Sequence, residues 1–295
     1  MIKNLLAIII FILAAFSVLS AEAATLYFQP EHLEIGVGET AKVDLILDSQ
    51  ENINAIEGTL DFSKDLFEIE DFNDGNTIIN LWITKPQLKE GDILFSGIIP
   101  GGYFASKGKI FSIELTAKKA GRTVFHLRDS RVLLNDGFGT PVFLETKSLS
   151  IAILSKPTGL TISKTEDKDT PEDFQLLIDK NPEIFKGKFF LAFATQDKGL
   201  GIDHYEIKER RESKIFGMTL RMPKKWQIAE SPYVLKDQKL RSFVYVKAID
   251  KAGNERIAVV EQRYPIKWYE YPLTWIIIIL GLSIAYLVKR ILWRK

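Results

Sequence analysis

The feature that most constrains this chain is an uninterrupted apolar run near its C-terminus. Between residues 273 and 288 no side chain is charged, and only three carry a hydroxyl group. About 20 apolar residues in a helix span the hydrocarbon core of a bilayer, and the run reaches this length if Lys289 and Arg290 extend their charged ends to the interface. We therefore predict one transmembrane anchor within residues 269–293.

The residues on either side of this run predict its orientation. An aromatic belt would precede it, and a basic cluster would follow it: Trp268, Tyr269, Tyr271 and Trp275 come before, and Lys289, Arg290, Arg294 and Lys295 come after. Because basic residues stay in the cytoplasm, the tail 294–295 should lie inside and the preceding residues outside. A buried helix of a globular domain is the alternative, but residues 276–279 are all isoleucine and leave no polar face.

The N-terminus has the three parts of a secretory signal peptide. Lys3 provides the positive charge, residues 5–19 form the apolar stretch, and an A-x-A site ends at Ala23. This pattern predicts cleavage before Ala24 and removal of residues 1–23. The chain contains no cysteine, which excludes a lipoprotein anchor, disulfides and thiol chemistry.

Residues 24–155 predict a domain of short strands. Apolar and polar residues alternate near 41–47, 55–62, 92–99 and 110–117, and this period of two is typical of strands with one buried face. Glycine, proline, asparagine and aspartate gather between these runs, and no stretch keeps a helical period. The pattern favours a β-sandwich or jelly roll.

The same segment resembles the cohesin family over residues 25–153. The motifs that carry the resemblance occur in the family's order at residues 37–40, 43–47, 53–69, 93–97, 101–104, 108–118 and 132–137. Cohesins are β-sandwich modules that bind dockerins, and their fold is similar to that of certain cellulose-binding modules. The resemblance implies a cohesin-like jelly-roll sandwich, and it leaves a protein and a polysaccharide as alternative ligands.

The resemblance also implies where a partner would bind. Cohesins use one sheet face for recognition, and the strand that begins at residue 53 contributes to it. A period of two directs Ala55, Glu57 and Thr59 outward and Ile56 toward the core. Cohesins commonly carry an asparagine and an aspartate where this chain has Ala55 and Glu57, so we expect a dockerin-like partner of different specificity.

Residues 156–268 predict a second all-β domain. Lys156 and Pro157 begin a polar stretch that separates it from the first domain. Residues 201–205 and 245–254 resemble bacterial immunoglobulin-like or fibronectin-III-like repeats, which usually act as spacers. Strands are expected near residues 189–195, 201–207, 242–250 and 257–260, with a turn at 250–254.

The remaining residues carry no catalytic signature. The sequence has no G-x-S-x-G elbow and no phosphate-binding or dinucleotide-binding glycine motif. The histidines, His32, His126 and His204, are too scattered for a zinc site. Acidic residues are interleaved with the basic ones, which argues against nucleic acid. We predict a protein that is not an enzyme, with no metal, no cofactor and no nucleic-acid partner.

Two features are candidate ligand sites. The acidic loop 71–76 offers oxygen ligands for calcium, but in an EF-hand register its glycine comes one position early and Trp82 occupies the twelfth place. A hairpin turn is the better interpretation of the loop. Aromatic rings could instead stack on sugars; the candidates are Tyr27, Phe104 and above all Trp82 and Tyr103.

These observations lead to two hypotheses. The first is a membrane-anchored surface protein, typical of bacterial envelopes, whose cohesin-like module binds a dockerin-like protein in trans. The partner would be a separate chain because this sequence has no duplicated aspartate-rich calcium loop. The second hypothesis is a carbohydrate-binding or adhesion module on the same stalk.

Overall fold

The computed structural model describes residues 24–160, 166–215, 218–221, 225–265, 267–270 and 272–293. The predicted signal peptide and the tail 294–295 lie outside the described residues. The chain divides into two compact units. The first unit comprises residues 1–167 and 198–201, and the second comprises residues 168–197 and 202–295.

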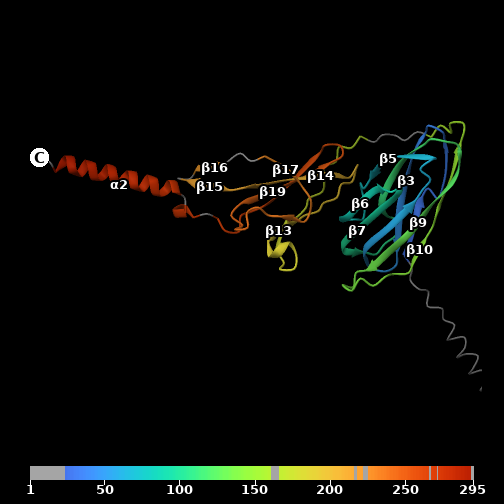
Figure 1. Ribbon diagram of the computed structural model, residues 1–295, viewed down its shortest axis with the longest axis horizontal. Coiled ribbons are helices and arrows are strands. Elements are labelled where there is room, and N and C mark those ends of the chain that lie inside the picture. Colours follow the sequence, from blue (N-terminus) through green and yellow to red (C-terminus); the bar gives the residue numbers. More distant parts are fainter. Residues whose placement is uncertain are drawn as a thin grey trace, which may run out of the picture. The chain divides into compact units, whose positions relative to one another are not determined.

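The first unit is a sandwich of two sheets, blue to green in Figure 1. The five-stranded sheet has the order β10-β1-β3-β8-β5, and the six-stranded sheet has the order β2-β11-β9-β4-β7-β6. Neighbours are antiparallel except for the pairs β1–β10 and β2–β11. The strands are β1 (Ala24–Gln29), β2 (His32–Gly36), β3 (Thr40–Ser49), β4 (Ile53–Asp61), β5 (Phe67–Asn73), β6 (Leu81–Lys89), β7 (Asp92–Tyr103), β8 (Gly108–Ala117), β9 (Gly121–Leu134), β10 (Leu144–Thr146) and β11 (Leu149–Leu154).

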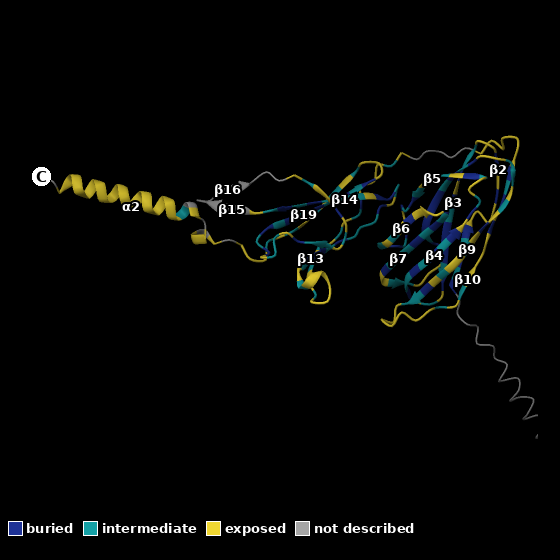
Figure 2. Cartoon of the chain, in the orientation of Figure 1, coloured by how far each residue is buried: buried dark blue, intermediate teal, exposed yellow. Residues whose placement is uncertain are grey.

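An apolar core fills the space between the two sheets. Along β4, Ile56 is buried whereas Ala55, Glu57 and Thr59 are partly exposed, so the predicted inward and outward positions are confirmed. Figure 2 shows the same alternation as bands of buried and intermediate residues along the strands of the sandwich. The prediction of an all-β first domain is therefore confirmed.

Aromatic rings occupy the centre of this core. The fully buried ring of Phe125 has edge-on contacts with Phe28, Phe62 and Phe67, at centroid distances of 6.5, 5.9 and 5.7 Å. Edge-to-face pairs at such distances stabilise a core beyond the burial of area alone. Phe125 lies on β9, so this cluster also holds in place a strand that borders the candidate site described below.

Glu39 fastens the segment that leaves the first sandwich. Its carboxylate accepts hydrogen bonds from Gly36 N at 2.6 Å, Thr158 Oγ1 at 2.6 Å and Gly159 N at 2.7 Å. The bond from Thr158, followed by those from the amides, lowers the pKa of Glu39 to about 2. The predicted domain boundary after residue 155 lies just before this clamped segment.

The second unit contains a three-stranded sheet, β12-β13-β18, a four-stranded sheet, β17-β14-β19-β20, and the hairpin β15-β16. Its apolar core includes Leu191, Ile207 and Val246. The predicted turn at 250–254 is confirmed, because Asp250 N donates to Asn254 O at 3.1 Å between β19 and β20. The elements are β12 (Leu177–Lys180), η1 (Phe185–Gly187), β13 (Phe189–Ala192), β14 (Ile202–Arg210), β15 (Glu212–Ile215), β16 (Met218–Arg221), β17 (Gln227–Ala229), β18 (Tyr233–Val234), β19 (Phe243–Asp250), β20 (Glu255–Val260) and η2 (Trp268–Glu270).

The predicted anchor segment forms the helix α2 (Pro272–Leu292). Its stretch Thr274–Leu292 has a mean hydropathy of 2.0, and none of the stretch is buried in the protein. Figure 2 shows exposed residues along almost the whole helix. The described part of the chain therefore has one helix that is long and apolar enough to cross a membrane.

The acidic loop 71–76 departs from the predicted hairpin. Strand β5 ends at Asn73, whose side chain accepts a hydrogen bond from Gly75 N at 2.8 Å, and Asn76 adopts a left-handed φ of 55°. This local turn chemistry is as expected. However, β5 pairs with β8 and β6 pairs with β7, so the turn joins one sheet to the other. The prediction of a hairpin was wrong because turn residues mark a change of direction and not the strands that pair.

Candidate functional site

The predicted partner face lies on the outer side of the six-stranded sheet, across β9, β4, β7 and β6. Cross-strand pairing groups its side chains into three rows, and we call these residues the β4 face. Neighbouring strands lie about 4.8 Å apart, and alternate residues along a strand lie about 6.8 Å apart. Four strands and three rows therefore give the β4 face an area of roughly 400 Å². In strand order the rows are Leu133–Ala55–Ile98–Leu81, Arg131–Glu57–Ser96–Thr84 and Arg128–Thr59–Leu94–Gln87.

The β4 face changes from apolar to polar along the strands. Its first row contains only apolar side chains, including Ile98 and Leu133, which are half-buried although they lie on the outer side of the sheet. The other two rows carry hydroxyl groups and charges. A central apolar area beside polar groups is typical of protein–protein interfaces, and about 800 Å² per partner is usual. The β4 face has the size expected for the centre of such an interface.

One ion pair crosses the middle row. Arg131 Nε donates to Glu57 Oε1 at 2.7 Å, and the two side chains are 67% and 42% exposed. An exposed pair of this kind contributes about 0–1 kcal/mol to stability, because water screens the charges and the side chains lose freedom. The pair therefore presents two opposite charges to a partner and adds little to the stability of the fold.

An irregularity in β9 hollows this part of the face. Two residues of β9, Asp129 and Ser130, lie opposite the single residue Gly58 of β4, between the pairs of Glu57 and Thr59. Such a bulge bends its strand and redirects nearby side chains. Gly58 lies opposite, where a Cβ would come within 2.7 Å of Ser130 Oγ. The result is a depression of about 540 Å³ on the β4 face.

The aromatic residues predicted for sugar stacking lie elsewhere. Trp82 pairs with Gly97 between two rows of the β4 face, so its ring points to the opposite side, packs against the core and donates from Nε1 to Asp74 Oδ2 at 3.0 Å. Tyr103 also packs against the core, and burial raises the pKa of its hydroxyl. Tyr27 lies in the five-stranded sheet. These three rings do not form one exposed platform.

The loop after β7 carries the most exposed of the predicted aromatic rings. Phe104 is 68% exposed. It lies outside the cross-strand rows of the β4 face. A single exposed ring offers one stacking surface, whereas the partner face offers three rows of side chains.

Most of the β4 face was not identified from the sequence. The sequence points to Ala55, Glu57 and Thr59 of β4, and the structure adds residues of β6, β7 and β9 that share their rows. The charges of Arg128 and Arg131 were visible in the sequence. Their position beside β4 was not, because it depends on pairing between residues far apart in the chain.

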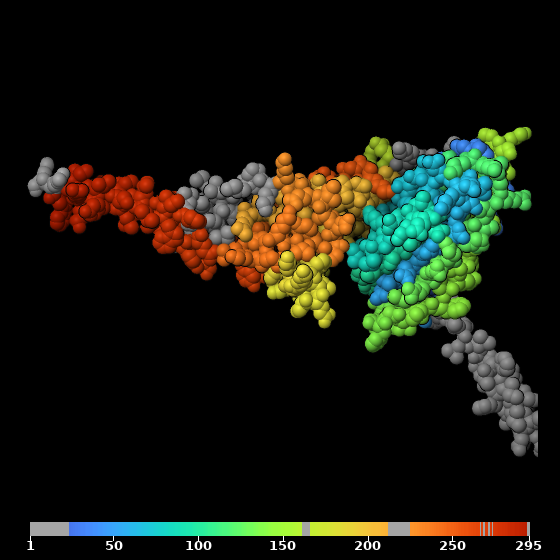
Figure 3. Space-filling model, in the orientation of Figure 1, coloured from blue at the N-terminus to red at the C-terminus, as the bar shows by residue number. Residues whose placement is uncertain are grey.

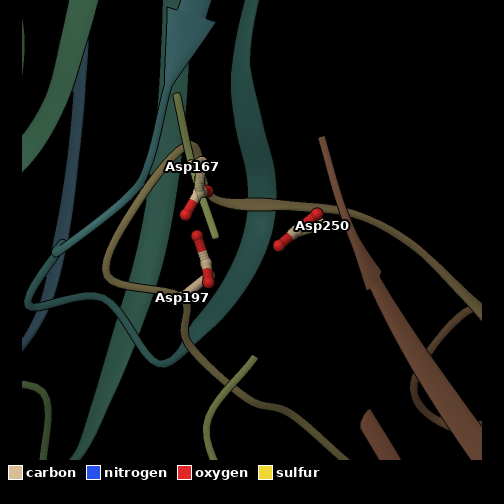
Figure 4. A group of neighbouring side chains, drawn as sticks. All are labelled: Asp167, Asp197 and Asp250. Atoms are coloured by element: carbon tan, nitrogen blue, oxygen red, sulfur yellow. The ribbon is translucent and has the colours of Figure 1, made fainter. Parts of the chain in front are cut away.

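Three aspartates that lie far apart in the sequence, and that no motif brings together, lie close together in the structure. Figure 4 shows Asp167, Asp197 and Asp250 as neighbours, and one carboxylate oxygen of each lies within 4.8 Å of the others. Carboxylate oxygens are ligands that Ca²⁺ prefers. Asp250 also accepts two hydrogen bonds of 2.8 Å from Asn254. Acidic groups often lie together without an ion, so we assign no metal to this cluster.

Comparison with known proteins gives matches to solved structures. No family model and no curated protein matches the chain. A non-cellulosomal cohesin from the archaeon Archaeoglobus fulgidus is 16% identical, with 45% of this chain and 92% of that chain covered and a TM-score of 0.39.

Two further matches are type I cohesins. The seventh cohesin of ScaB from Pseudobacteroides cellulosolvens is 16% identical, with coverages of 48% and 97% and a TM-score of 0.39. A chain of a cohesin–dockerin complex from Clostridium thermocellum is 13% identical, with coverages of 45% and 92% and a TM-score of 0.38. These matches are modules of the kind that residues 25–153 resemble.

Proposed function

We propose that this protein is a membrane-anchored surface protein whose first domain, residues 24–155, binds a protein partner in trans. The β4 face carries the proposal, because it combines an apolar row, an exposed ion pair and a depression on one sheet surface. A solvated sheet face with no partner would more simply carry polar side chains in every row. Protein binding also agrees with the resemblance to cohesins.

The proposed partner is a dockerin-like segment with its own specificity. The row of Leu133, Ala55, Ile98 and Leu81 would cover apolar side chains of the partner. The Glu57–Arg131 pair, in the middle row beside this apolar row, would meet groups of complementary charge. Opposite charges across an interface select partners and speed association more than they add affinity. An apolar residue and a longer carboxylate at positions 55 and 57 would favour partners other than ordinary dockerins.

The rest of the chain would display this domain at the cell surface. Residues 1–23 would direct secretion, residues 156–268 would form a stalk, and residues 269–293 would anchor the protein, with 294–295 in the cytoplasm. The apolar helix α2 supports the anchor. Sheets of three and four strands support an immunoglobulin-like stalk, since a constant-type immunoglobulin sandwich has the same division.

A carbohydrate-binding function is the alternative. It requires flat rings that face solvent together, as in modules that stack aromatic residues on sugars. Trp82 and Tyr103 are partly buried against the core, so the structure favours the protein partner.

Capture of the partner tests the proposed function. Immobilised residues 24–265 would be exposed to the secretome of the native organism, with and without chelator, in parallel with a Glu57→Arg variant. The proposal expects a discrete protein that the unmodified chain retains, that the variant loses, and that rebinds when purified. Retention of polysaccharide instead, with loss on Trp82→Ala or Tyr103→Ala, would support the alternative.

A further inference from the structure

A second surface, in the second unit, is rich in basic residues. It is a pocket of about 600 Å³ whose lining includes Lys239, Arg241, Arg263 and Lys267 beside Tyr264. The described residues that line it include no acidic side chain. A concave site with several cations and an aromatic ring is suited to an anionic group.

The charge of this basic pocket is only partly neutralised. Arg241 Nη1 lies 2.8 Å from Glu270 Oε2, which pairs one of the four cations. The side chains of Lys239, Arg263 and Lys267 are exposed. Lys267 Nζ lies over the ring of Tyr269, 5.8 Å from its centroid. Glu270 pairs with Arg241, and the described lining residues include no carboxylate that pairs with the other three cations. The pocket therefore keeps an excess of positive charge.

Three contacts attach this pocket to the chain that enters α2. Tyr264 N donates to Leu240 O at 3.1 Å, which fixes one wall of the pocket. The Arg241–Glu270 pair holds η2, and Trp275 Nε1 of α2 donates to Tyr269 O at 2.9 Å. In Figure 3 the orange residues near 240 lie against the red residues that lead into α2.

These contacts keep the pocket near the start of the apolar helix. Pro272 follows Lys267 by five positions, and a fully extended chain of that length covers about 17 Å. Three of the intervening positions form the 3₁₀ turn η2, which rises by only about 2 Å per residue and shortens this distance. Attraction between a charge and a membrane surface extends over about 8–10 Å. The basic side chains are thus within reach of lipid headgroups when α2 spans a bilayer.

Exposed aromatic rings lie near the start of the apolar helix as well. Tyr264, Tyr269 and Trp275 are 59%, 43% and 53% exposed. Such rings favour the boundary between hydrocarbon and water, where one side is apolar and the other is wet. Tyr264 lines the pocket, Tyr269 lies in η2 and Trp275 lies in the first turns of α2, so the rings extend from the pocket to the start of the apolar helix, where a membrane interface would lie.

We propose that this basic pocket binds the phosphate headgroup of an anionic membrane lipid. The bound lipid would give the second unit a contact with the membrane besides α2. The inference rests on the membrane anchorage stated under the proposed function. Each basic side chain at an anionic surface strengthens binding roughly fivefold.

The test uses the full chain reconstituted in phosphatidylcholine vesicles that contain one tenth phosphatidylglycerol. A photo-crosslinking amino acid replaces Tyr264, and mass spectrometry identifies the lipids attached to it. Selectivity is the ratio of phosphatidylglycerol to phosphatidylcholine adducts divided by the ratio of the two lipids in the vesicle. The variant Lys239→Gln/Arg263→Gln removes two exposed cations of the pocket, and Lys186→Gln/Lys251→Gln removes two exposed cations of the same unit outside it.

The unmodified chain should select phosphatidylglycerol, the pocket variant should lose about 25-fold in selectivity, and the control variant should match the unmodified chain. Equal labelling of the two lipids, or equal selectivity of both variants, would overturn the proposal. In phosphatidylcholine vesicles with soluble glycerol phosphate, a glycerol phosphate adduct without lipid selectivity would identify a soluble ligand and also overturn it.

Release of the chain by carbonate would instead show that the anchor failed. Retention without any lipid adduct would leave the anchor intact and refute the pocket alone.

Discussion

Reversal of the charge at Glu57 separates a binding role of the β4 face from a structural one. The substitution Glu57→Arg removes the ion pair with Arg131 and places a second guanidinium opposite it across β4 and β9. Both side chains of the pair are exposed, at 42% and 67%. The new side chain therefore has room in solvent, and the core beneath it, including Ile56, is unchanged.

The cost to stability follows from this exposure. Loss of an exposed pair costs about 0–1 kcal/mol, and like charges directly opposite each other cost about 0.2–1 kcal/mol more. The free energy of unfolding should fall by about 1 kcal/mol, which lowers the melting temperature by roughly 2–4 °C in a domain of this size. A partner group that complements Glu57 is positively charged, and two like charges that face each other across an interface cost several kcal/mol of binding free energy. Affinity should therefore fall at least about 30-fold, equivalent to about 2 kcal/mol.

Titration calorimetry with the captured partner, together with thermal unfolding, measures both quantities. The control is Glu114→Arg on β8 in the five-stranded sheet, which places an arginine between Lys42 of β3 and Asp71 of β5. Only Glu57→Arg should lose affinity, because residue 114 lies outside the β4 face. Unfolding of the Glu57→Arg variant, or equal loss of affinity in the two variants, would refute the assignment of the partner to the β4 face.

Four further predictions concern the fold and its anchorage. Phe125→Ala should lower the free energy of unfolding by about 3–5 kcal/mol in urea titrations, because it empties the centre of the aromatic cluster, and a loss under 1 kcal/mol would contradict this packing. The pKa of Glu39 lies at about 2, below its ordinary 4.5, so its clamp should be fully present above pH 4.5 and weaken as the pH falls toward 2. Unfolding curves of the unmodified chain and Glu39→Gln should then converge in acid, and a constant difference would contradict the clamp. A chain that ends after Tyr264 should be secreted in soluble form, and membrane retention of it after a carbonate wash would place the anchor elsewhere. Residues 24–155 and 157–265 should each unfold cooperatively on their own, and failure of both fragments to fold would argue against two domains.

The sequence predicted local geometry where one strand decides it. In β4 the alternation of Ala55, Ile56 and Glu57 was sufficient, because successive side chains of a strand point to opposite faces. The neighbours of β4 could not be predicted in the same way. Glu57 and Arg131 are separated by 74 positions, and no local pattern reports which distant strand pairs with which.

Irregular pairing explains the remaining differences. Trp82 was named as a ring that could stack on sugars, which requires it to face solvent. The register of β6 with β7 shifts between Trp82 and Thr84 and again before Gln87, so a strict period of two does not hold there, and the ring packs against the core. The bulge in β9 that shapes the depression was not predicted either. Asp129 there adopts a left-handed φ of 49°, which aspartate tolerates, but a local turn residue does not show which strand lies opposite the bulge.

The most direct test of the central claim is site-specific photo-crosslinking of the displayed protein in its native organism. A photoreactive amino acid would replace Thr59 on the β4 face or, as the control, the exposed Lys42 on the outer side of the opposite sheet. Our account predicts a discrete protein adduct from position 59 and none from position 42. An adduct from position 42 alone, or polysaccharide at either position without protein, would contradict it.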